Sequence, residues 1–397
     1  MFLVKGLLVT CALASMRMAG AELTASRWQE AVNSFSVDLL KELAGGRPGN
    51  LVFSPVSAAT VLALLLQGAK GDSSRQLKAA LRLGKCEARE GYGRLSRSMQ
   101  EERDTTAVLE AASRVFARPG LDLSAGFRRA ATRNFGSGLE EVDFSGGDGP
   151  EAINSWVSRA THGRIPSIVG DGLSPDVVLV LANAVYFKSP WRHPFSRSMT
   201  SNGTFSRLAG SEVTAPFMQL GKLLQAGEDP SRGVKWVRLP FVDGGFQMII
   251  VVPNEKRGLA RVLTDLTHED VKMFTQTGDL RFARVKVPRF KIDSNINLVP
   301  SLRELGVTDI FEAQLADLRG VSPCGGLVVS RVLQKADMDV DEEGATASAA
   351  TVVEMERKSS IPHFNPITIE ADHPFLALIA DEKGSPIFVA VVEDPSA

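Results

Sequence analysis

Cysteine and histidine are scarce in this chain of 397 residues. Of the three cysteines, Cys11 lies in an N-terminal segment that we expect to be removed, which leaves Cys86 and Cys324. One pair so far apart is no disulfide framework; the two thiols either pair or stay free, and free thiols are favoured. The five histidines show no metal-ligand spacing, so no zinc site is expected at His162, His193, His268, His363 or His373.

Motifs of common enzyme classes are also missing. The chain has no G-x-S-x-G elbow of serine hydrolases, and His268-Glu269 is not followed by the second histidine of H-E-x-x-H. The glycines around Lys70 do not form the G-x-x-x-x-G-K frame of a phosphate-binding loop. No pair of carboxylates stands out as catalytic. These absences argue against a secreted hydrolase, and we expect no cofactor and no metal.

Neither sign of charge dominates, because 45 Lys and Arg face 46 Asp and Glu, a net charge of −1. The chain therefore offers no bulk attraction to nucleic acid or to an anionic membrane. One predicted helical region is basic, and weak glycosaminoglycan binding is one interpretation of Arg75, Lys78, Arg82, Lys85, Arg89, Arg94 and Arg97. Because Glu87 and Glu90 intervene, an ordinary solvated helix face is the better interpretation.

No hydrophobic run is long enough to cross a bilayer. Residues 1–21 are typical of a secretory signal, with a short apolar stretch at 6–16 and an A-x-A cleavage site at 19–21. We therefore expect a secreted, extracellular protein of residues 22–397. Its one N-x-[ST] sequon starts at Asn202, a candidate site for a surface glycan.

The apolar periodicity predicts helices early and strands later. Three-four spacing or helix-forming composition indicates helices at 25–42, 55–68, 75–83 and 151–164, and residues 106–116 turn strand-like. Apolar or alternating runs indicate strands at 176–187, 246–253, 281–292, 375–381 and 387–394. This order argues for an α+β domain. Length alone suggests two or three domains of about 150 residues, but no linker divides the chain.

The segment "EEGATASAATVVEMERKSS", residues 342–360, is neither obvious core nor an ordinary turn. In a strand, one face would carry only small or aliphatic side chains, namely Ala345, Ala347, Ala349, Thr351 and Val353. Such a segment can be a solvated loop and can also enter a crowded sheet, because it has no proline and no large side chain before Val352. A flexible linker is the alternative, although the alternation does not favour it.

The chain resembles the serpin family over nearly its whole length beyond the signal. The matching segments are "NLVFSPVSAATVLALLLQGAKG" (50–71), "INSWVSRATHGRIPSIV" (153–169), "LANAVYFKSPWRHPF" (181–195), "VPRFKI" (287–292), "LRELGVTDIF" (302–311), "KADMDVDEEGATASAAT" (335–351) and "ADHPFLALI" (371–379). The resemblance implies a single domain with three β-sheets, about nine helices and an exposed reactive-centre loop at about 342–366. In the third segment Ser189 replaces the usual glycine.

The resemblance also implies a mechanism. A protease attacks a bait bond in the loop and forms an acyl-enzyme; the cleaved loop then inserts into a sheet and traps the protease. The serpin supplies no catalytic residue and is not an enzyme. We expect a monomer that forms a covalent complex with a trypsin-like serine protease. The alternative is a non-inhibitory serpin acting as a carrier, storage or chaperone protein, whose hinge would hold bulky or charged residues.

Matching residue by residue, the proximal hinge is Glu342, Glu343 and Gly344, followed by Ala345, Thr346, Ala347, Ser348, Ala349, Ala350 and Thr351. The family's spacing from Glu342 places the P1 residue at Lys358 and P1′ at Ser359, with Arg357 as the alternative P1. A lysine at P1 suits the acidic pocket of trypsin-like proteases. The stretch to His373 is longer than usual, which leaves room for a bond further on, at Ile361 or His363.

The family's shutter region, where the sheet opens, matches Ser54, Ser57 and Asn183. The family usually has a histidine where this chain has Gln334; an amide can also hydrogen-bond there, but it does not titrate. Trp191 matches the tryptophan of the breach at the top of the sheet. Each of these residues would also pack as ordinary core.

Overall fold

The structure is a computed structural model that describes residues 25–45, 48–100, 108–144, 148–170, 172–174, 176–242, 245–345 and 365–396. Within these ranges there are nine α-helices. The first covers residues 25–44, and the others are α2 (Pro55–Gly68), α3 (Gly71–Leu81), α4 (Lys85–Gln100), α5 (Ala125–Arg129), α6 (Asp148–Ala160), α7 (Leu259–Asp265), α8 (His268–Gln276) and α9 (Val299–Glu304).

The α2 helix shows how local sequence sets a boundary. Ser54 is the N-cap residue, and its hydroxyl accepts a hydrogen bond from the backbone N–H of Ser57, while Pro55 fixes the first turn. The helix ends at Gly68, where a Cβ would lie 2.8 Å from the backbone nitrogen of Val321. The predicted range 55–68 is therefore confirmed, and a close approach of another chain segment explains the glycine.

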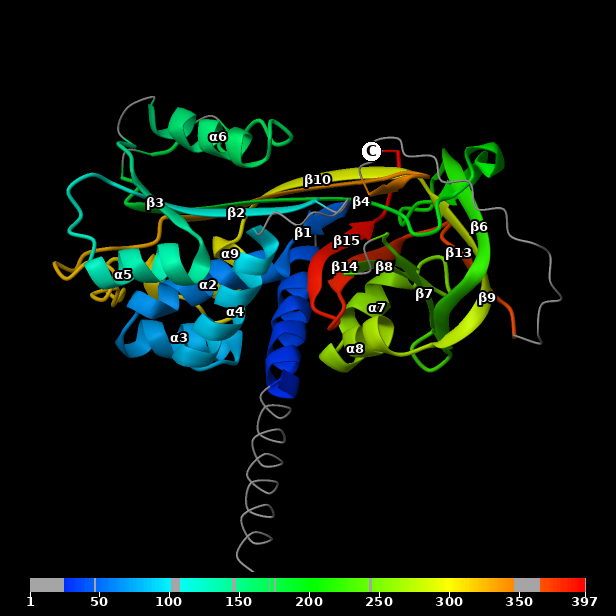
Figure 1. Ribbon diagram of the computed structural model, residues 1–397, viewed down its shortest axis with the longest axis horizontal. Helices are drawn as coiled ribbons and strands as arrows, with labels where there is room; N and C mark the ends of the chain where they lie inside the picture. Colours follow the sequence, from blue (N-terminus) through cyan, green and yellow to red (C-terminus); the bar gives the residue numbers. More distant parts are fainter. Residues whose placement is uncertain are drawn as a thin grey trace, which may run out of the picture.

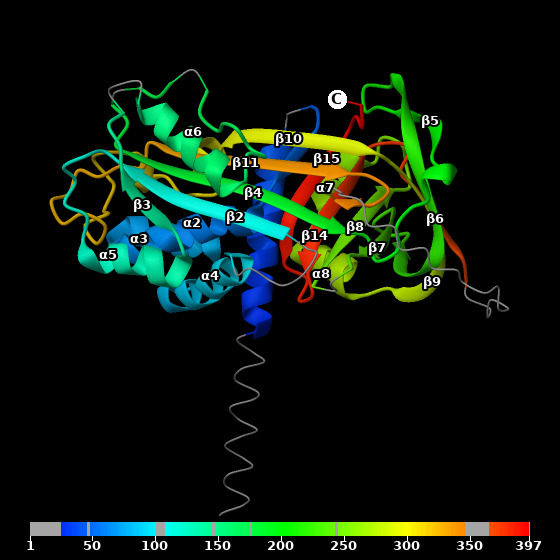
Figure 2. The same cartoon turned by 45° about the horizontal axis from the view of Figure 1, so that its top comes forward.

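One sheet has six strands in the order β10-β11-β12-β4-β2-β3. They are β10 (Phe290–Asn297), β11 (Arg331–Val340), β12 (Gly344–Ala345), β4 (Leu179–Pro190), β2 (Val108–Ala117) and β3 (Gly138–Glu141). Figure 2 shows β10, β11, β4 and β2 side by side, with α6 lying across their outer face. The other face packs on α2, which contacts β4 and β2.

The second sheet has nine strands and follows the order β1-β15-β14-β8-β7-β6-β9-β13, with β5 also on β6. They are β1 (Leu51–Phe53), β15 (Pro386–Val392), β14 (Phe375–Asp381), β8 (Phe246–Pro253), β7 (Val234–Pro240), β6 (Glu212–Asp229), β9 (Asp279–Pro288), β13 (Ile367–Glu370) and β5 (Ser201–Ser206). Figure 1 shows β6 and β9 curving along one end of the molecule.

The resemblance predicts three sheets, and the long strand β6 joins two of them here. Its first part pairs with β5 and β9, and only Ala226–Asp229 pair with β7, so hydrogen bonds run without a break from β13 to β1. The larger of two hydrophobic clusters runs from Ala31 to Val392 and includes side chains of both sheets, and the smaller one packs α6 on the six-stranded sheet. The chain is therefore one domain, and the estimate of two or three from length alone is wrong.

One predicted strand is also wrong. The alternating run 281–292 is not one strand but two: β9 ends at Pro288 and β10 begins at Phe290, and the two belong to different sheets. Proline lacks the N–H that a ladder needs, so Pro288 ends the pairing, and Arg289 carries the chain across. Alternation alone does not reveal such a change of sheet.

Candidate functional site: a strand poised in an open sheet

The hinge begins with a tight reversal after β11. The Asp341 carboxylate accepts hydrogen bonds from the backbone N–H groups of Glu343 (2.8 Å) and Gly344 (3.2 Å). The backbone N–H of Asp341 donates to the carbonyl of Gly344 at 3.0 Å. A side-chain oxygen that holds two successive amides is typical of an Asx turn. The turn directs the next two residues back along β11.

These two residues, Gly344 and Ala345, form β12 between β11 and β4. Ala345 lies opposite Val340 of β11 and Ser189 of β4, and Gly344 lies opposite Pro190. Further down, β11 and β4 pair directly with each other, in parallel, from Arg331 to Asp337 of β11. The six-stranded sheet is therefore open at one end, and the hinge already occupies the opening.

Close packing at the opening explains its small residues. A Cβ on Gly344 would lie 2.1 Å from the carbonyl oxygen of Ser189, which no side chain could tolerate. Ala345 is buried in the main core. The Ser189 hydroxyl, where the family motif has glycine, is buried without a hydrogen-bond partner among the described residues. An unsatisfied hydroxyl costs about 1–3 kcal/mol.

Glu342 anchors the base of the hinge. Its side chain is only 1% exposed. It accepts hydrogen bonds from the Arg289 guanidinium at 2.6–2.9 Å and from the Thr200 hydroxyl at 2.5 Å. Burial by itself would raise the pKa of Glu342, but the hydrogen bonds from Arg289 and Thr200 outweigh it, so the pKa lies below its ordinary value. The carboxylate therefore stays ionised and ties the hinge to the residues that immediately precede β10 and β5.

We expect an Arg289→Ala variant to lose about 2–3 kcal/mol of unfolding free energy at pH 7. A broken buried pair costs about 3–5 kcal/mol, and the partial exposure of Arg289 reduces the loss. Because the pKa of Glu342 is lowered in the folded state, its contribution is complete above the unfolded carboxyl pKa and disappears as the pH falls through the folded pKa. Urea unfolding at pH 7 and at about pH 3.5 measures both effects.

An Arg197→Ala variant is the matched control. Arg197 pairs with the neighbouring Glu343 at 2.5 Å, but its side chain is 67% exposed. An exposed pair contributes about 0–1 kcal/mol, so this variant should unfold almost as the wild type does. Equal losses for Arg289→Ala and Arg197→Ala would contradict the special role of the Glu342 pair.

Trp191 closes the top of the opening. Its indole N–H donates to the carbonyl of Asp341 at 2.8 Å, and its backbone N–H donates to the carbonyl of Glu343 at 2.8 Å. Its ring stacks on Phe241, with centroids 4.6 Å apart and planes 9° apart. Trp191 thus contacts the hinge directly while serving as packed core.

The predicted shutter residues lie together beneath the seam between β11 and β4. The Gln334 amide accepts a hydrogen bond from the backbone N–H of Ser54 (2.8 Å) and donates to the carbonyl of Ser54 (2.9 Å) and to the Asn183 side chain (3.2 Å). The Asn183 amide donates in turn to the hydroxyls of Ser57 and Ser113. The network is buried and holds both strands to the start of α2. An amide at position 334 thus makes both donor and acceptor bonds without a titratable group.

Several predicted site residues lie outside the described residues. These are the hinge residues Thr346, Ala347, Ser348, Ala349, Ala350 and Thr351, the P1 candidates Lys358 and Arg357, Ser359, and the later candidates Ile361 and His363. The segment therefore stays a prediction of the sequence. Asn202 is described, and it lies exposed on β5.

A family model described as Serpin (serine protease inhibitor) matches residues 30–395. This chain belongs to the serpin family. Iripin-8 of Ixodes ricinus is 31% identical over 382 residues, which cover 93% of this serpin and 94% of that protein. Leukocyte elastase inhibitor of Bos taurus is 31% identical over 363 residues, covering 89% and 95%. The solved structure of Manduca sexta Serpin-12 matches with a TM-score of 0.82 at 31% identity, covering 92% and 99%.

Several residues of the predicted basic region contact neighbouring groups. Arg82 pairs with Asp38 at 2.5 Å, Arg75 pairs with Asp72 at 2.6 Å, and Arg97 donates to two backbone carbonyls. Burial, followed by the charges of Lys78 and Lys70, lowers the pKa of Lys85. These contacts agree with an ordinary solvated helix face, and a glycosaminoglycan site stays a prediction.

Cys86 and Cys324 are both exposed and free, as the composition favoured. Within the described ranges, no three His, Cys, Asp or Glu side chains gather as metal ligands. None of the helices described is long and apolar enough to span a bilayer.

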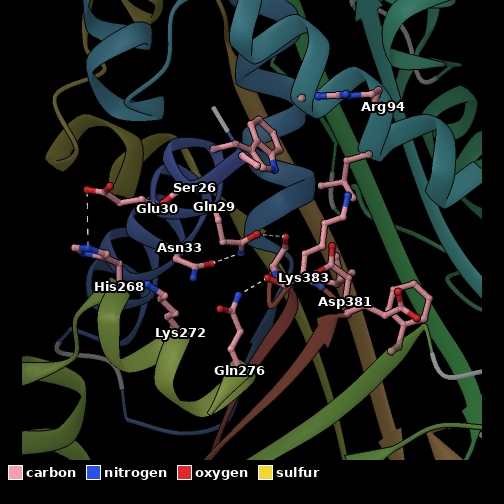
Figure 3. Close-up of a pocket in the computed structure, with 18 of the residues that line it drawn as sticks. Ser26, Gln29, Glu30, Asn33, Arg94, His268, Lys272, Gln276, Asp381 and Lys383 are labelled. Atoms are coloured by element: carbon pink, nitrogen blue, oxygen red, sulfur yellow. Dashed lines mark hydrogen bonds and ion pairs between the residues drawn. The ribbon is translucent and has the colours of Figure 1, made fainter. Parts of the chain in front are cut away.

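A cavity of about 1010 Å³ lies between the first helix, α4, α8 and the turn after β14. Figure 3 shows some of its polar side chains paired with one another, namely Gln29 with Asn33 and Glu30 with His268. The Gln29 side-chain amide donates a hydrogen bond to Asn33 Oδ1 at 3.0 Å. His268 Nε2 lies 3.9 Å from Glu30 Oε1, and Lys272 Nζ lies 3.8 Å from Glu269 Oε2. The cavity is built from different elements than the hinge, so it is a separate feature of this serpin.

Proposed function

We propose that this serpin is a secreted inhibitor of trypsin-like serine proteases that acts as a suicide substrate. The protease cleaves a bond in the segment after Ala345, and the freed strand then inserts between β11 and β4 before the acyl-enzyme is hydrolysed. In this reaction the serpin is not an enzyme, because the protease supplies every catalytic group. Secretion rests on residues 1–21, and a glycan at Asn202 belongs to the same proposal.

The register of β12 carries this proposal. Ala345 pairs with Ser189 and Val340, and β11 pairs with β4 in a parallel register that agrees with both pairings. If the chain continued in this register, Thr351 would reach the level of Asn183 and Gln334, where the two strands now bond to each other. No shift of either strand along its axis is needed; the strands only have to separate.

The same register fixes which side chains would be buried. Ala345 points into the main core, so every second residue after it would do the same. Before Arg357 these residues are Ala347, Ala349, Thr351, Val353 and Met355, none of them charged. The first large charged side chain on that face would be Arg357, beyond the level of Leu179, where β4 begins. The sequence of the segment therefore suits insertion along the whole of the seam.

The trypsin-like class rests on Lys358, with Arg357 as the alternative. A buried carboxylate in the specificity pocket of such proteases needs a cationic partner, and both residues supply one. Ser359 would then be the residue after the cleaved bond.

Incubating residues 22–397 with trypsin and analysing the mixture on denaturing gels tests the proposal. We expect a covalent complex whose mass is the sum of trypsin and the N-terminal fragment of the serpin, because the peptide after the cleaved bond separates on the denaturing gel. Cleavage of the serpin without any complex, at every ratio of the two proteins, would rule out inhibition by this mechanism.

The alternative is a carrier, and the cavity of about 1010 Å³ is the feature that favours it. Small-molecule sites of this size usually carry a few polar groups that are free to orient a ligand. Here the polar groups named above mostly bind one another, whereas the hinge is small, buried and in register. Inhibition is therefore the function that the geometry supports best.

A further inference from the structure

An apolar patch lies on the outer face of the sheet formed by β6, β9 and β13. Of the large hydrophobic side chains that are exposed among the described residues, Leu223 (41% exposed) and Leu280 (47%) occupy this face. Leu223 lies opposite Phe282, which is half-buried, and Leu280 lies opposite Gln225. Exposed apolar groups that gather on one face often mark an interaction site, whereas scattered ones do not.

The patch reaches the end of the reactive-centre loop. The register of β13 and β9 places the exposed Pro366 level with Phe282. Just before it, the carbonyl of Asn365 accepts a hydrogen bond from the Arg281 guanidinium at 2.9 Å, which ties this point of the chain to β9. Figure 1 shows β9 and β6 at the edge of the molecule, where none of the helices described covers them. The apolar patch is Leu223, Leu280, Phe282 and Pro366.

Gly221 of β6 lies beneath the Phe282 ring of the patch and leaves room for it. A Cβ on Gly221 would lie 3.3 Å from the Cζ atom of Phe282, so the ring lies close over the backbone of β6. The exposed Arg284 and the ion pair between Lys286 and Glu370 follow along β9 and border the patch on one side. The result is an apolar surface with a polar rim, as protein interfaces have.

Chain length decides what can cover this surface. Asn365 is the seventh residue after Lys358, so the bait bond lies within about 25 Å of Asn365, at the edge of the patch, even at full extension. A protease domain of about 220 residues has a radius of gyration of about 17 Å, and its body extends about 20 Å to either side of its active-site cleft. A stable interface also takes about 20–30 residues from each partner, more than a loop tip supplies.

We propose that the apolar patch of Leu223, Leu280, Phe282 and Pro366 is a docking surface for the body of the serine protease engaged at the loop. This inference rests on the proposed function, because it takes the bound protease as the partner. Docking at this face strengthens the encounter complex and leaves the later insertion step unchanged, since the patch lies in the other sheet from the β11–β4 seam.

A double variant, Leu223→Gln with Leu280→Gln, tests the docking surface. Its affinity for trypsin with an alanine in place of the active-site serine should fall about five- to tenfold, since apolar contact area is lost. Its association rate constant with active trypsin should fall by the same factor, while the number of serpin molecules consumed per inhibited protease stays at the wild-type value. The matched control is Leu315→Gln, because Leu315 is 58% exposed but lies outside the patch.

An affinity and a rate constant within twofold of the wild type would overturn the docking surface, as would an equal loss in Leu315→Gln. Thermal unfolding of each variant separates misfolding from lost contact, since surface substitutions should change stability little. If the wild-type serpin binds inactive trypsin but forms no covalent complex with active trypsin, the proposed function fails and the binding comparison still tests the patch.

Discussion

Trypsin should cleave an Ala347→Arg variant of this serpin without being trapped. Continuing the register of β12 places residue 347 on the face that Ala345 buries in the main core. Burying an unpaired guanidinium costs many kcal/mol, so the inserted strand would stop at this level. The acyl-enzyme would then hydrolyse first. We expect the number of serpin molecules consumed per trypsin inhibited to rise at least tenfold, measured by titration and by the ratio of cleaved serpin to complex on gels.

A Thr346→Arg variant is the matched control, because its side chain would point to the opposite face. In this register, residue 346 would lie opposite Asp339 of β11 and Lys188 of β4. The Asp339 side chain is only partly buried. A cation can reach solvent and an aspartate on that face, so trapping should persist near the wild-type ratio. If Thr346→Arg fails as badly as Ala347→Arg, the register deduced from Gly344 and Ala345 is wrong.

Replacing Lys358 with alanine should remove trypsin inhibition. The specificity pocket of trypsin-like proteases holds a buried carboxylate, and an uncharged P1 side chain leaves that carboxylate without a partner. A site built to bind a polar group rejects a substrate that lacks this group by about 10⁴-fold. We therefore expect the association rate constant of Lys358→Ala with trypsin to fall by at least about 10³-fold. The loss of trypsin activity with time measures the association rate constant. Mass spectrometry of the released C-terminal peptide identifies the cleaved bond.

The comparison variant is Arg357→Ala, which should keep most of the activity if Lys358 is P1. A released peptide that begins at Ser359 in the wild type supports this assignment. Undiminished inhibition by Lys358→Ala would instead place the bond at Arg357 or further along, at Ile361 or His363.

Local signals located most of the fold. Ser54 and Gly68 bounded α2, and the apolar runs at 246–253 and 375–381 are β8 and β14 without change. The sequence did not show that residues 281–292 divide between two sheets, because period-2 alternation continues on both sides of Pro288. Nor did it show that β6 joins two groups of strands, since strand pairing depends on segments far apart in the chain.

The sequence predicted those features of the candidate site that depend on one segment of the chain. It did not predict the contacts that this segment makes with residues far away in the sequence. Alternation predicted that Ala345 would share a small apolar face, and Ala345 does point into the core. The sequence reasoning missed Arg289 and Thr200 at Glu342, and Ser113 at Asn183. These partners are 53 to 142 residues away in the chain. An arginine in "VPRFKI" gives no local sign that it neutralises a hinge carboxylate.

The two-residue strand β12 has a kinetic consequence. Adding a strand to a sheet is slowest at its first contact, because the chain must be brought to the right place before any hydrogen bond forms. Here Gly344 and Ala345 already pair with β4 and β11, held by the Asp341 turn and the Glu342 anchor. In the proposed mechanism, insertion would therefore begin as elongation from this two-residue nucleus once β11 and β4 separate, and its first contact would already be made before the acyl-enzyme forms.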